Sequence, residues 1–339
     1  MIFYVCHRLH AYTLASLLLY FRTDLQGSVR FVPYDEREHL LEISRGTVLW
    51  TDLDRLSEAE IEACSNLSQR MKSQQPDLFQ LNHPRKSLQR FDLLRMLFAD
   101  GINDFNVYRP ESLPAGMRFP VFLRDETGAA YKVPPLLQSP AELGEALSNL
   151  GTMNFVRPIV VEFGAKAGAD GSYRKYSAYR IGERSYAQHC FASKEWFIKV
   201  QGGGMSGQHR VEHTEFVRDN PHAVELMPIF EKAGISYGRI DYTIVDGRIQ
   251  VFEINTNPTV LNDPPTPFDR YDSLPYANMH ADALAQLPYA NDPLSTPVID
   301  ETHFQILGRL RNKYRRRRMK LTVRKGFRSF RDAMFGAKP

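Results

Sequence analysis

Apolar positions in the first part of the chain fall into short β-type runs separated by helical spacing. Ile2 to Val5 is a continuous apolar run that predicts a first strand, and Val29 to Tyr34 predicts another, with an amphipathic helix between them. Ser57 is followed three residues later by Glu60, a capping-box pattern that predicts the start of a further helix. We therefore expect residues 1–80 to form a small α/β lobe.

The pattern changes again further along the chain. Residues from about 118 are rich in strand signals, with a helix predicted near Pro140 to Leu150, and residues after 198 return to a mixed α/β pattern. A chain of 339 residues exceeds the usual size of one compact domain, so we expect several lobes around a cleft. The predicted fold class is α/β (α+β), with segments at 1–80, 81–197, 198–300 and 301–339.

The clearest local pattern is a β-hairpin in the third of these segments. Arg239 to Val245 alternates polar and apolar side chains, and Ile249 to Ile254 is a second β-rich run. The dipeptide Asp246-Gly247 between them is a strong signal for a tight turn. Glu253 and Asn255 are two residues apart and so share one face of the second strand.

Asp241, Glu253 and Asn255 offer the hard oxygen ligands that suit Mg²⁺. The strand register decides whether they can act together. A two-residue turn alone places Asp241 opposite Phe252 and facing away from Glu253, whereas a three-residue loop or a bulge places it opposite Glu253. A metal site requires the second register, and the alternative is an ordinary hairpin with solvated acids.

These residues also carry a family resemblance. The run Gly-Arg-Ile-Asp at 238–241, followed by Glu-Ile-Asn-Thr-Asn-Pro at 253–258, resembles the C-terminal signature of the ATP-grasp ligases, which include the D-alanine:D-alanine ligases. The resemblance implies that Asp241, Glu253 and Asn255 hold two Mg²⁺ ions against the phosphates of ATP. It also implies that Arg239 stabilises an acyl-phosphate step.

The resemblance extends upstream with two departures from the family pattern. Arg90 lies at a helix start where the family usually has a lysine, and Arg124 ends a strand that is similar to the family's Pro-Val-hydrophobic-Val-Lys strand. Both positions are implied to bind nucleotide phosphates. A guanidinium group can still bind phosphate oxygens there, but as a planar fork rather than as a compact point charge.

Two further stretches are implied to contact the nucleotide. Glu162 and Phe163 end an apolar strand that resembles the hinge whose backbone pairs with the adenine edge, and Arg174 or Lys175 on the next strand is implied to face substrate or phosphate. A solvated strand is the alternative for these cations. Gly202 to Gly207 matches a dinucleotide-binding fingerprint, but a loop beside the active site is the favoured interpretation.

The composition is that of a folded protein, with 43% hydrophobic and 24% charged residues. No apolar run approaches the roughly 20 residues of a membrane-spanning helix, and the N-terminus does not resemble a signal peptide. The three cysteines are too few and too widely spaced for a disulfide scaffold. A cytoplasmic location is expected, and the C-terminal tail could add peripheral attachment to a membrane.

That tail is strongly basic. From Arg309 to Pro339 there are 13 Lys and Arg residues and one acid, Asp332, so the remaining 308 residues carry a net charge of −8. Apolar residues are interspersed among the cations. Such a segment could contact an anionic membrane, a nucleic acid, an acidic protein or the chain's own acidic body, and it could also be a solvated helix without a partner.

The leading hypothesis is an ATP- and Mg²⁺-dependent ligase that activates a small-molecule carboxylate as an acyl phosphate and joins it to an amine, forming ADP. Phosphoryl transfer of this kind needs charge neutralisation more than covalent help from the protein. An ATP-grasp kinase would use the same nucleotide and metal residues. A non-enzymatic adaptor acting through the basic tail is the third hypothesis. The identity of the substrates and the oligomeric state do not follow from the sequence.

Overall fold

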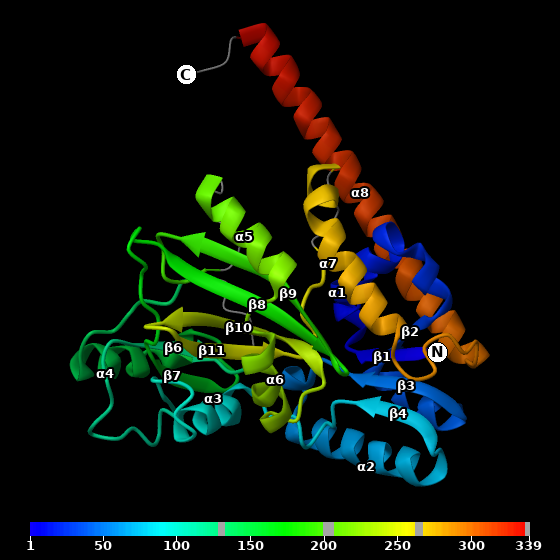
Figure 1. The fold of residues 1–339 in the computed structure, drawn as a ribbon, viewed down its shortest axis with the longest axis horizontal. Helices are drawn as coiled ribbons and strands as arrows, with labels where there is room; N and C mark the ends of the chain where they lie inside the picture. Colours follow the sequence, from blue (N-terminus) through cyan, green and yellow to red (C-terminus); the bar gives the residue numbers. More distant parts are fainter. Residues whose placement is uncertain (128–132, 199–206, 262–266, 336–339) are drawn as a thin grey trace. The chain divides into compact units, whose positions relative to one another are not determined.

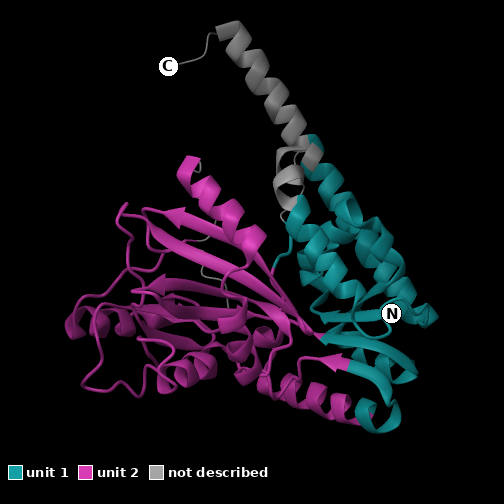
Figure 2. Cartoon of the chain, in the orientation of Figure 1, with its two compact units in different colours: residues 1–49, 71–79, 259–339 teal, residues 50–70, 80–258 magenta. Residues whose placement is uncertain are grey.

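The computed structural model describes residues 1–127, 133–198, 207–261 and 267–335, and it describes side chains except those of 267–273, 318 and 320–335. The chain divides into two compact units, and Figure 2 shows them in different colours. The first contains residues 1–49, 71–79 and 259–339, and the second contains residues 50–70 and 80–258. The division into four segments expected from the sequence stays a prediction, because this division into two units does not test it.

The first unit is built on a four-stranded sheet with the order β2-β1-β3-β4, in which β1 and β2 are parallel (Figure 1). The predicted strands near residues 2 and 29 are confirmed as β1 and β2. Every residue of both strands is buried, as expected for parallel strands. The strands of this sheet are β1 (Ile2–Cys6), β2 (Val29–Pro33), β3 (Arg45–Trp50) and β4 (Asp77–Leu81).

Helices separate and follow the strands of this sheet in the sequence. The longest of these helices is the C-terminal one. It packs on β2, where the Phe31 N–H donates to Nδ1 of His303 over 3.1 Å and Arg30 pairs with Asp300. The capping box predicted before the second helix is confirmed, because Ser57 N–H and Oγ both donate to Glu60. The α-helices are α1 (Tyr12–Ser16), α2 (Glu58–Gln74), α7 (Pro267–Ala285) and α8 (Pro297–Phe335); α1 is followed by a π-helical turn (Leu17–Phe21).

The second unit contains two antiparallel sheets. One has four strands in the order β11-β10-β8-β9, and the other has three in the order β5-β7-β6. Together with the parallel pair, they confirm the predicted mixed α/β class. The elements are β5 (Val107–Tyr108), β6 (Val121–Asp125), β7 (Pro158–Glu162), β8 (Tyr173–Ile181), β9 (Arg184–Ser193), β10 (Tyr237–Val245), β11 (Arg248–Asn255), α3 (Arg90–Ala99), α4 (Pro140–Ser148), α5 (Gly207–Asp219) and α6 (Ala223–Lys232).

The smaller sheet separates a core from a cavity. Val121 and Leu123 of β6 pack with Leu143 of α4 in a hydrophobic cluster. Because side chains alternate along a strand, Phe122 and Arg124 lie on the opposite face, where they line a cavity. The alternation of β6 thus delivers one aromatic ring and one cation to the same wall.

Short 3-10 helices fill several connections. They lie at Arg8–His10, Thr23–Gly27, Tyr34–Glu42, Leu53–Arg55 and Leu150–Thr152. Within the described residues, no helix has the length and apolar character needed to cross a bilayer.

Candidate active site

The hairpin formed by β10 and β11 has the register that a metal site requires. Its turn is the two-residue Asp246-Gly247 connection, with φ of 49° and 79°, as in a type I′ turn. A bulge between Asp241 and Tyr242 then shifts the pairing, so that Asp241 lies opposite Glu253 instead of Phe252. The tight turn and the required register therefore coexist because one extra residue is accommodated along the strand.

A cavity of about 400 Å³ opens in front of these carboxylates, and strands of both sheets contribute to its wall. Its size is within the range of small-molecule sites. Most of the lining is apolar or aromatic, and the charged groups belong mainly to β6, β8, β10 and β11. The charged and amide lining residues are Arg124, Glu162, Arg174, Lys175, Arg239, Asp241, Glu253 and Asn255.

Glu253 is held between two arginines. It accepts hydrogen bonds from Arg90, at the start of α3, and from Arg124 of β6, the latter over 3.2 Å. Burial opposes ionisation of Glu253, but Arg90 and Arg124 outweigh it and lower its pKa to about 2. Burial and repulsion from Arg90 lower the pKa of Arg124 to about 10. Glu253 is thus ionised under all physiological conditions.

Asp241 has its own pair of cations. Arg239 donates to both carboxylate oxygens, over 2.8 and 3.2 Å, and Lys175 lies 3.6 Å away. Burial disfavours the charged form of Asp241, but Arg239 and Lys175 lower its pKa below the usual value. The cluster therefore contains four cations and two carboxylates, a net charge of +2. A buried excess of positive charge of this kind favours an anionic ligand.

The two phosphate-site candidates have unused hydrogen-bonding capacity. Nε of Arg90 and Nε of Arg124 are buried and have no hydrogen-bond partner among the described residues. A buried donor without an acceptor costs about 1–3 kcal/mol, and more when it is charged. An oxyanion bound between these arginines would remove that cost, so the observed geometry fits a phosphate group.

The donor set around the carboxylates also fits Mg²⁺. Asn255 lines the same cavity, and its side-chain oxygen accepts the Asn257 N–H over 2.8 Å, which fixes the orientation of the amide. Among the described residues there is no group of three or more His, Cys, Asp or Glu side chains that could hold a metal ion. Mg²⁺ does not need one, because it usually takes one or two carboxylates and completes its shell with water and phosphate oxygens.

Two residues beside Asp241 were not predicted from the sequence to belong to the site. Ser177 of β8 is paired with Asp241 in the sheet and donates to its carboxylate over 2.7 Å. Since the Ser177 proton is used there, Nε2 of His189, 2.8 Å away, must donate to the Ser177 oxygen. Burial and the nearby Arg239 and Lys175 hold the pKa of His189 well below its usual value, so the ring is neutral. These residues form a polar row that orients Asp241.

The side chain of Glu162 is held by hydrogen bonds within the small sheet. Its carboxylate accepts the N–H of Asn106 over 3.0 Å, the hydroxyl of Tyr108 over 2.9 Å and the N–H of Arg118 over 2.9 Å. The side chain therefore braces the small sheet. The hinge contact expected at Glu162 and Phe163 is one of the backbone and stays a prediction, and the Phe163 N–H is bonded to the Pro120 oxygen over 2.9 Å.

An aromatic group forms the apolar end of the cavity. Trp196 lies between Phe122 and Phe163, with ring centroids 5.1 and 5.4 Å from theirs. Phe163 was predicted from the sequence, but Trp196 was missed because it lies outside any recognised motif. The group offers stacking surfaces for a flat ring such as a purine base.

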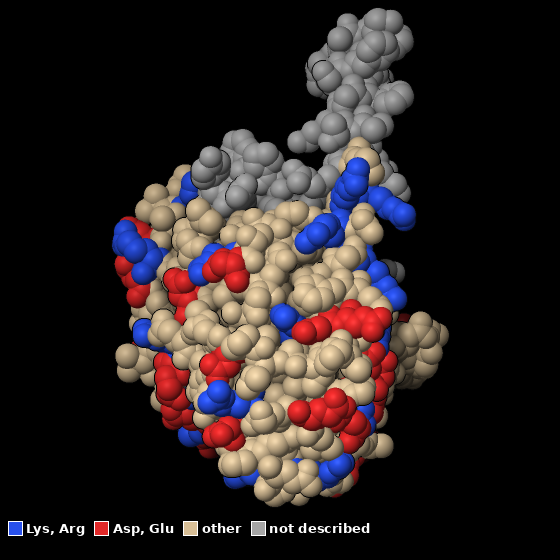
Figure 3. All heavy atoms as spheres, turned by 90° about the vertical axis from the view of Figure 1, so that its right-hand side faces the viewer, with Lys and Arg blue, Asp and Glu red and all other residues tan. Residues whose placement is uncertain are grey.

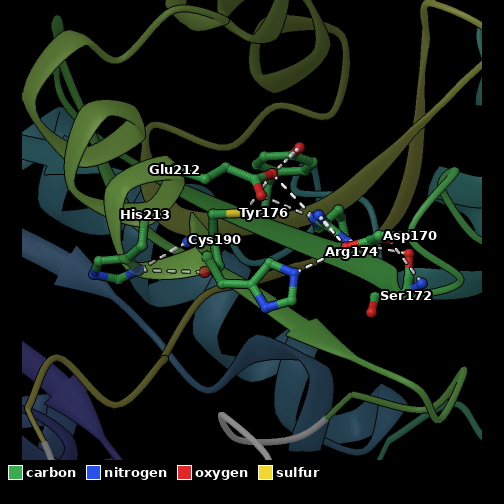
Figure 4. Close-up of polar contacts among 8 residues, drawn as sticks. Asp170, Ser172, Arg174, Tyr176, Cys190, Glu212 and His213 are labelled. Atoms are coloured by element: carbon green, nitrogen blue, oxygen red, sulfur yellow. Dashed lines mark hydrogen bonds and ion pairs between the residues drawn. The ribbon is translucent and has the colours of Figure 1, made fainter. Parts of the chain in front are cut away.

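Arg174 is already neutralised by two acids. Figure 4 shows its guanidinium between Asp170 and Glu212, at 3.0 Å from each. Glu212 also accepts from the hydroxyl of Tyr176 and lies 3.6 Å from Sγ of Cys190. Burial, with Glu212, raises the pKa of the Cys190 thiol, so it stays protonated near neutral pH and is a poor nucleophile. Arg174 therefore fixes α5 to β8 in this structure.

The glycine-rich run at 202–207 lies outside the described residues except for Gly207, which begins α5. All other predicted site residues are described. Arg90, Arg124, Lys175, Arg239, Asp241, Glu253 and Asn255 lie at one charged cluster, whereas Glu162, Phe163 and Arg174 lie elsewhere along the cavity wall.

Comparisons with known proteins found no matching family model and no curated protein of similar sequence. Solved structures with a similar chain path include the D-alanine–D-alanine ligase of Bacillus anthracis complexed with ATP, with a TM-score of 0.47 and 13% identity, covering 92% of this chain and 98% of that one. They also include a RimK domain ATP-grasp protein of Sphaerobacter thermophilus, with a TM-score of 0.47, 13% identity and coverages of 83% and 98%. For D-cycloserine synthetase DcsG the TM-score is 0.48, with 14% identity and the same coverages. The first two names include those that the sequence resemblance suggested, D-alanine–D-alanine ligase and ATP-grasp, but similarity at this level carries no argument about activity, which has to come from the site.

Proposed function

We propose that this chain is an ATP-grasp enzyme that uses ATP and Mg²⁺ to activate a small-molecule carboxylate as an acyl phosphate and joins it to an amine, releasing ADP. One observation carries the proposal: two opposed carboxylates and four cations, with a net charge of +2, lie at one end of an apolar cavity of about 400 Å³. The complex of ATP with one Mg²⁺ ion has a charge of about −2 near neutral pH, so it complements this cluster.

The roles follow from the contacts. Asp241, Glu253 and Asn255 would hold Mg²⁺, which neutralises phosphate charge during transfer. Arg90 and Arg124 now bind Glu253, and each has a buried Nε without a partner among the described residues. When a phosphate enters, these guanidinium groups can bind its oxygens while the carboxylate turns to the metal. The ion pairs of Arg90 and Arg124 with Glu253 would thus be replaced by arginine–phosphate and carboxylate–metal contacts when the nucleotide binds.

Arg239 is the candidate for the chemical step. It is buried, lines the cavity and is held in place by Asp241 and by Gln188, whose oxygen it reaches over 3.1 Å. The neighbouring carboxylate raises its pKa, after the opposing effect of burial, so it remains charged. A fixed cation at this place can stabilise the acyl phosphate and the oxyanion that forms when the amine attacks. Lys175 would add a second positive charge.

The aromatic group would bind the base. Phe122, Phe163 and Trp196 line the same cavity as the charged cluster, so one ligand can contact both. If the purine ring of ATP stacks on these side chains, the phosphates of the same nucleotide can reach Arg90 and Arg124. Carbonyl groups at the end of β7 would accept hydrogen bonds from the edge of the base, because the N–H groups of Glu162 and Phe163 already donate to the oxygens of Asn106 and Pro120.

The test is product analysis with Mg²⁺ and ATP against pools of amino acids and small carboxylates, with ADP, AMP and phosphate measured separately. ADP, free phosphate and a product with a new amide mass support the ligase. ADP with a phosphorylated product, and no amide, would instead identify a kinase using the same residues. Asp241→Asn should abolish either reaction, and Glu212→Gln, which alters an acid outside the charged cluster, should retain it.

A further inference from the structure

The C-terminal helix α8 has two parts of different character. Its first part is anchored in the first unit: His303, Ile306, Leu307 and Tyr314 are buried, and α8 packs against β2 and α1. Among the side chains described after Tyr314, Arg315, Arg316 and Arg317 are exposed and Met319 is 52% exposed. The helix nevertheless continues to Phe335. About 30 Å of helix therefore follows Tyr314, at 1.5 Å per residue.

The sequence of this second part is amphipathic. Large apolar residues recur at helical intervals of four, four, three and four, and this spacing places such positions along one face of a helix. They are Met319, Val323, Phe327, Phe330 and Met334. Cationic positions lie on the remaining arc of the helix, which starts beside the stripe at Lys320, continues through Arg331, Arg324 and Arg328, and reaches the opposite side at Lys325. Leu321 and Phe335 fall on this arc as well.

Charge distinguishes this segment from the rest of the chain. Residues 309–339 contain 13 Lys and Arg and one acid, whereas the preceding 308 residues have a net charge of −8. Figure 3 shows Lys and Arg side chains gathered along the described stretch of α8. An anionic surface would attract this helix and would repel most of the remaining surface, so contact would be made through α8.

We propose that the second part of α8 lies on the surface of an anionic lipid bilayer, with its apolar stripe between the lipid head groups and its cations paired with lipid phosphates. A basic helix that gathers Phe and Met on one face is typical of segments that bind in the plane of a membrane interface. A nucleic acid would attract the same cations, but its phosphate backbone offers no apolar contact to five large apolar residues along one face of a helix. The apolar stripe therefore decides in favour of lipid.

The experiment measures binding of the full chain to vesicles by co-sedimentation. One set contains neutral phosphatidylcholine alone, and the other contains added phosphatidylserine at about a third of the lipid. We expect binding to the anionic set only, and weaker binding as salt is raised. The double variant Phe327→Ser and Phe330→Ser keeps every charge but removes two rings, and it should bind the anionic vesicles about tenfold or more weakly.

Phe304→Ser is the matched control. Phe304 lies in the anchored part of the same helix and is 55% exposed, so its loss should leave vesicle binding unchanged. The proposal is overturned if the double variant binds as well as the unchanged chain, because the stripe is then not in the bilayer. It is also overturned if the unchanged chain fails to bind the anionic vesicles. A duplex DNA or RNA oligonucleotide that then binds the unchanged chain and the double variant equally would identify nucleic acid as the partner instead. Circular dichroism of each variant confirms that the fold is retained.

Discussion

Glu253→Gln tests the central electrostatic argument. The change keeps the size of the side chain but removes one of two negative charges, so the cluster with Arg90 and Arg124 goes from a net charge of +2 to +3. Breaking a buried ion pair typically costs roughly 3–5 kcal/mol. Because the Glu253 side chain is still 20% exposed, solvent screens part of this loss, and we expect destabilisation of about 2–3 kcal/mol.

Although Glu253→Gln should lower the stability of the fold, it should strengthen the binding of metal-free ATP. A more positive cluster should bind ATP more tightly without Mg²⁺, so metal-free ATP should raise the melting temperature of Glu253→Gln more than that of the unchanged chain. Turnover with Mg²⁺ and ATP should fall by at least about 100-fold, because a metal ligand is lost. Differential scanning fluorimetry with and without Mg²⁺, alongside ADP release, measures both effects.

The matched control is Glu212→Gln. Glu212 is also paired with a partly buried arginine, Arg174, but it lies outside the charged cluster. This variant should lose some stability while keeping its Mg²⁺ dependence. The reasoning is refuted if Glu253→Gln turns over ATP within threefold of the unchanged chain, or if both variants respond identically to metal-free ATP.

Other changes probe separate parts of the site. Trp196→Ala should raise the KM for ATP about tenfold with little change in kcat, because the stacking surface contributes binding only; unchanged KM would exclude the aromatic group from base binding. Ser177→Ala removes a donor to Asp241, so a Mg²⁺ titration should show kcat/KM reduced about tenfold and a weaker apparent metal affinity; an unchanged titration would count against the polar row. Asp54 has a pKa raised to about 6 by burial, despite the nearby Arg90, so its folded form retains a proton more strongly and stability falls as pH rises from about 4 to about 6. Asp54→Asn should therefore stabilise the chain by about 1–2 kcal/mol at pH 7.5 and by little at pH 4, as measured by urea unfolding; equal effects at both pH values would refute the assignment.

Local features of the fold could be predicted because their causes are local. The Ser57 and Glu60 capping box depends on residues three apart, and the Asp246-Gly247 turn depends on two adjacent ones. Binary alternation was enough to place Asp241 and Glu253 on adjacent strands. The register remained open in the sequence because a bulge depends on how the whole hairpin packs, and neither residue at the bulge is a glycine.

Features that depend on distant pairing could not be predicted. Ser177 and His189 act on Asp241 only because β8 lies between β9 and β10, an order that the sequence does not specify. The backbone contact with the base expected at Glu162 stays a prediction, and the partners of its side chain, Asn106 and Tyr108, could not be read from the sequence because they come from a different strand region. Single motifs identify such residues without revealing their partners.

The bulge between Asp241 and Tyr242 also divides the hairpin into two regions with different tolerance to alteration. Residues on the Arg239 side of it determine which side chains meet across the strands at the site, whereas the end around Asp246 and Gly247 is joined to them by a regular ladder. A protein engineer could therefore exchange the turn for another two-residue turn, or attach a reporter there, without moving Asp241 relative to Glu253. Deleting Phe252 would place Glu253 opposite Asp241 in a regular ladder, so the pairing of the two carboxylates would survive, whereas the local bend of the strand and one ring of the cavity wall would be lost.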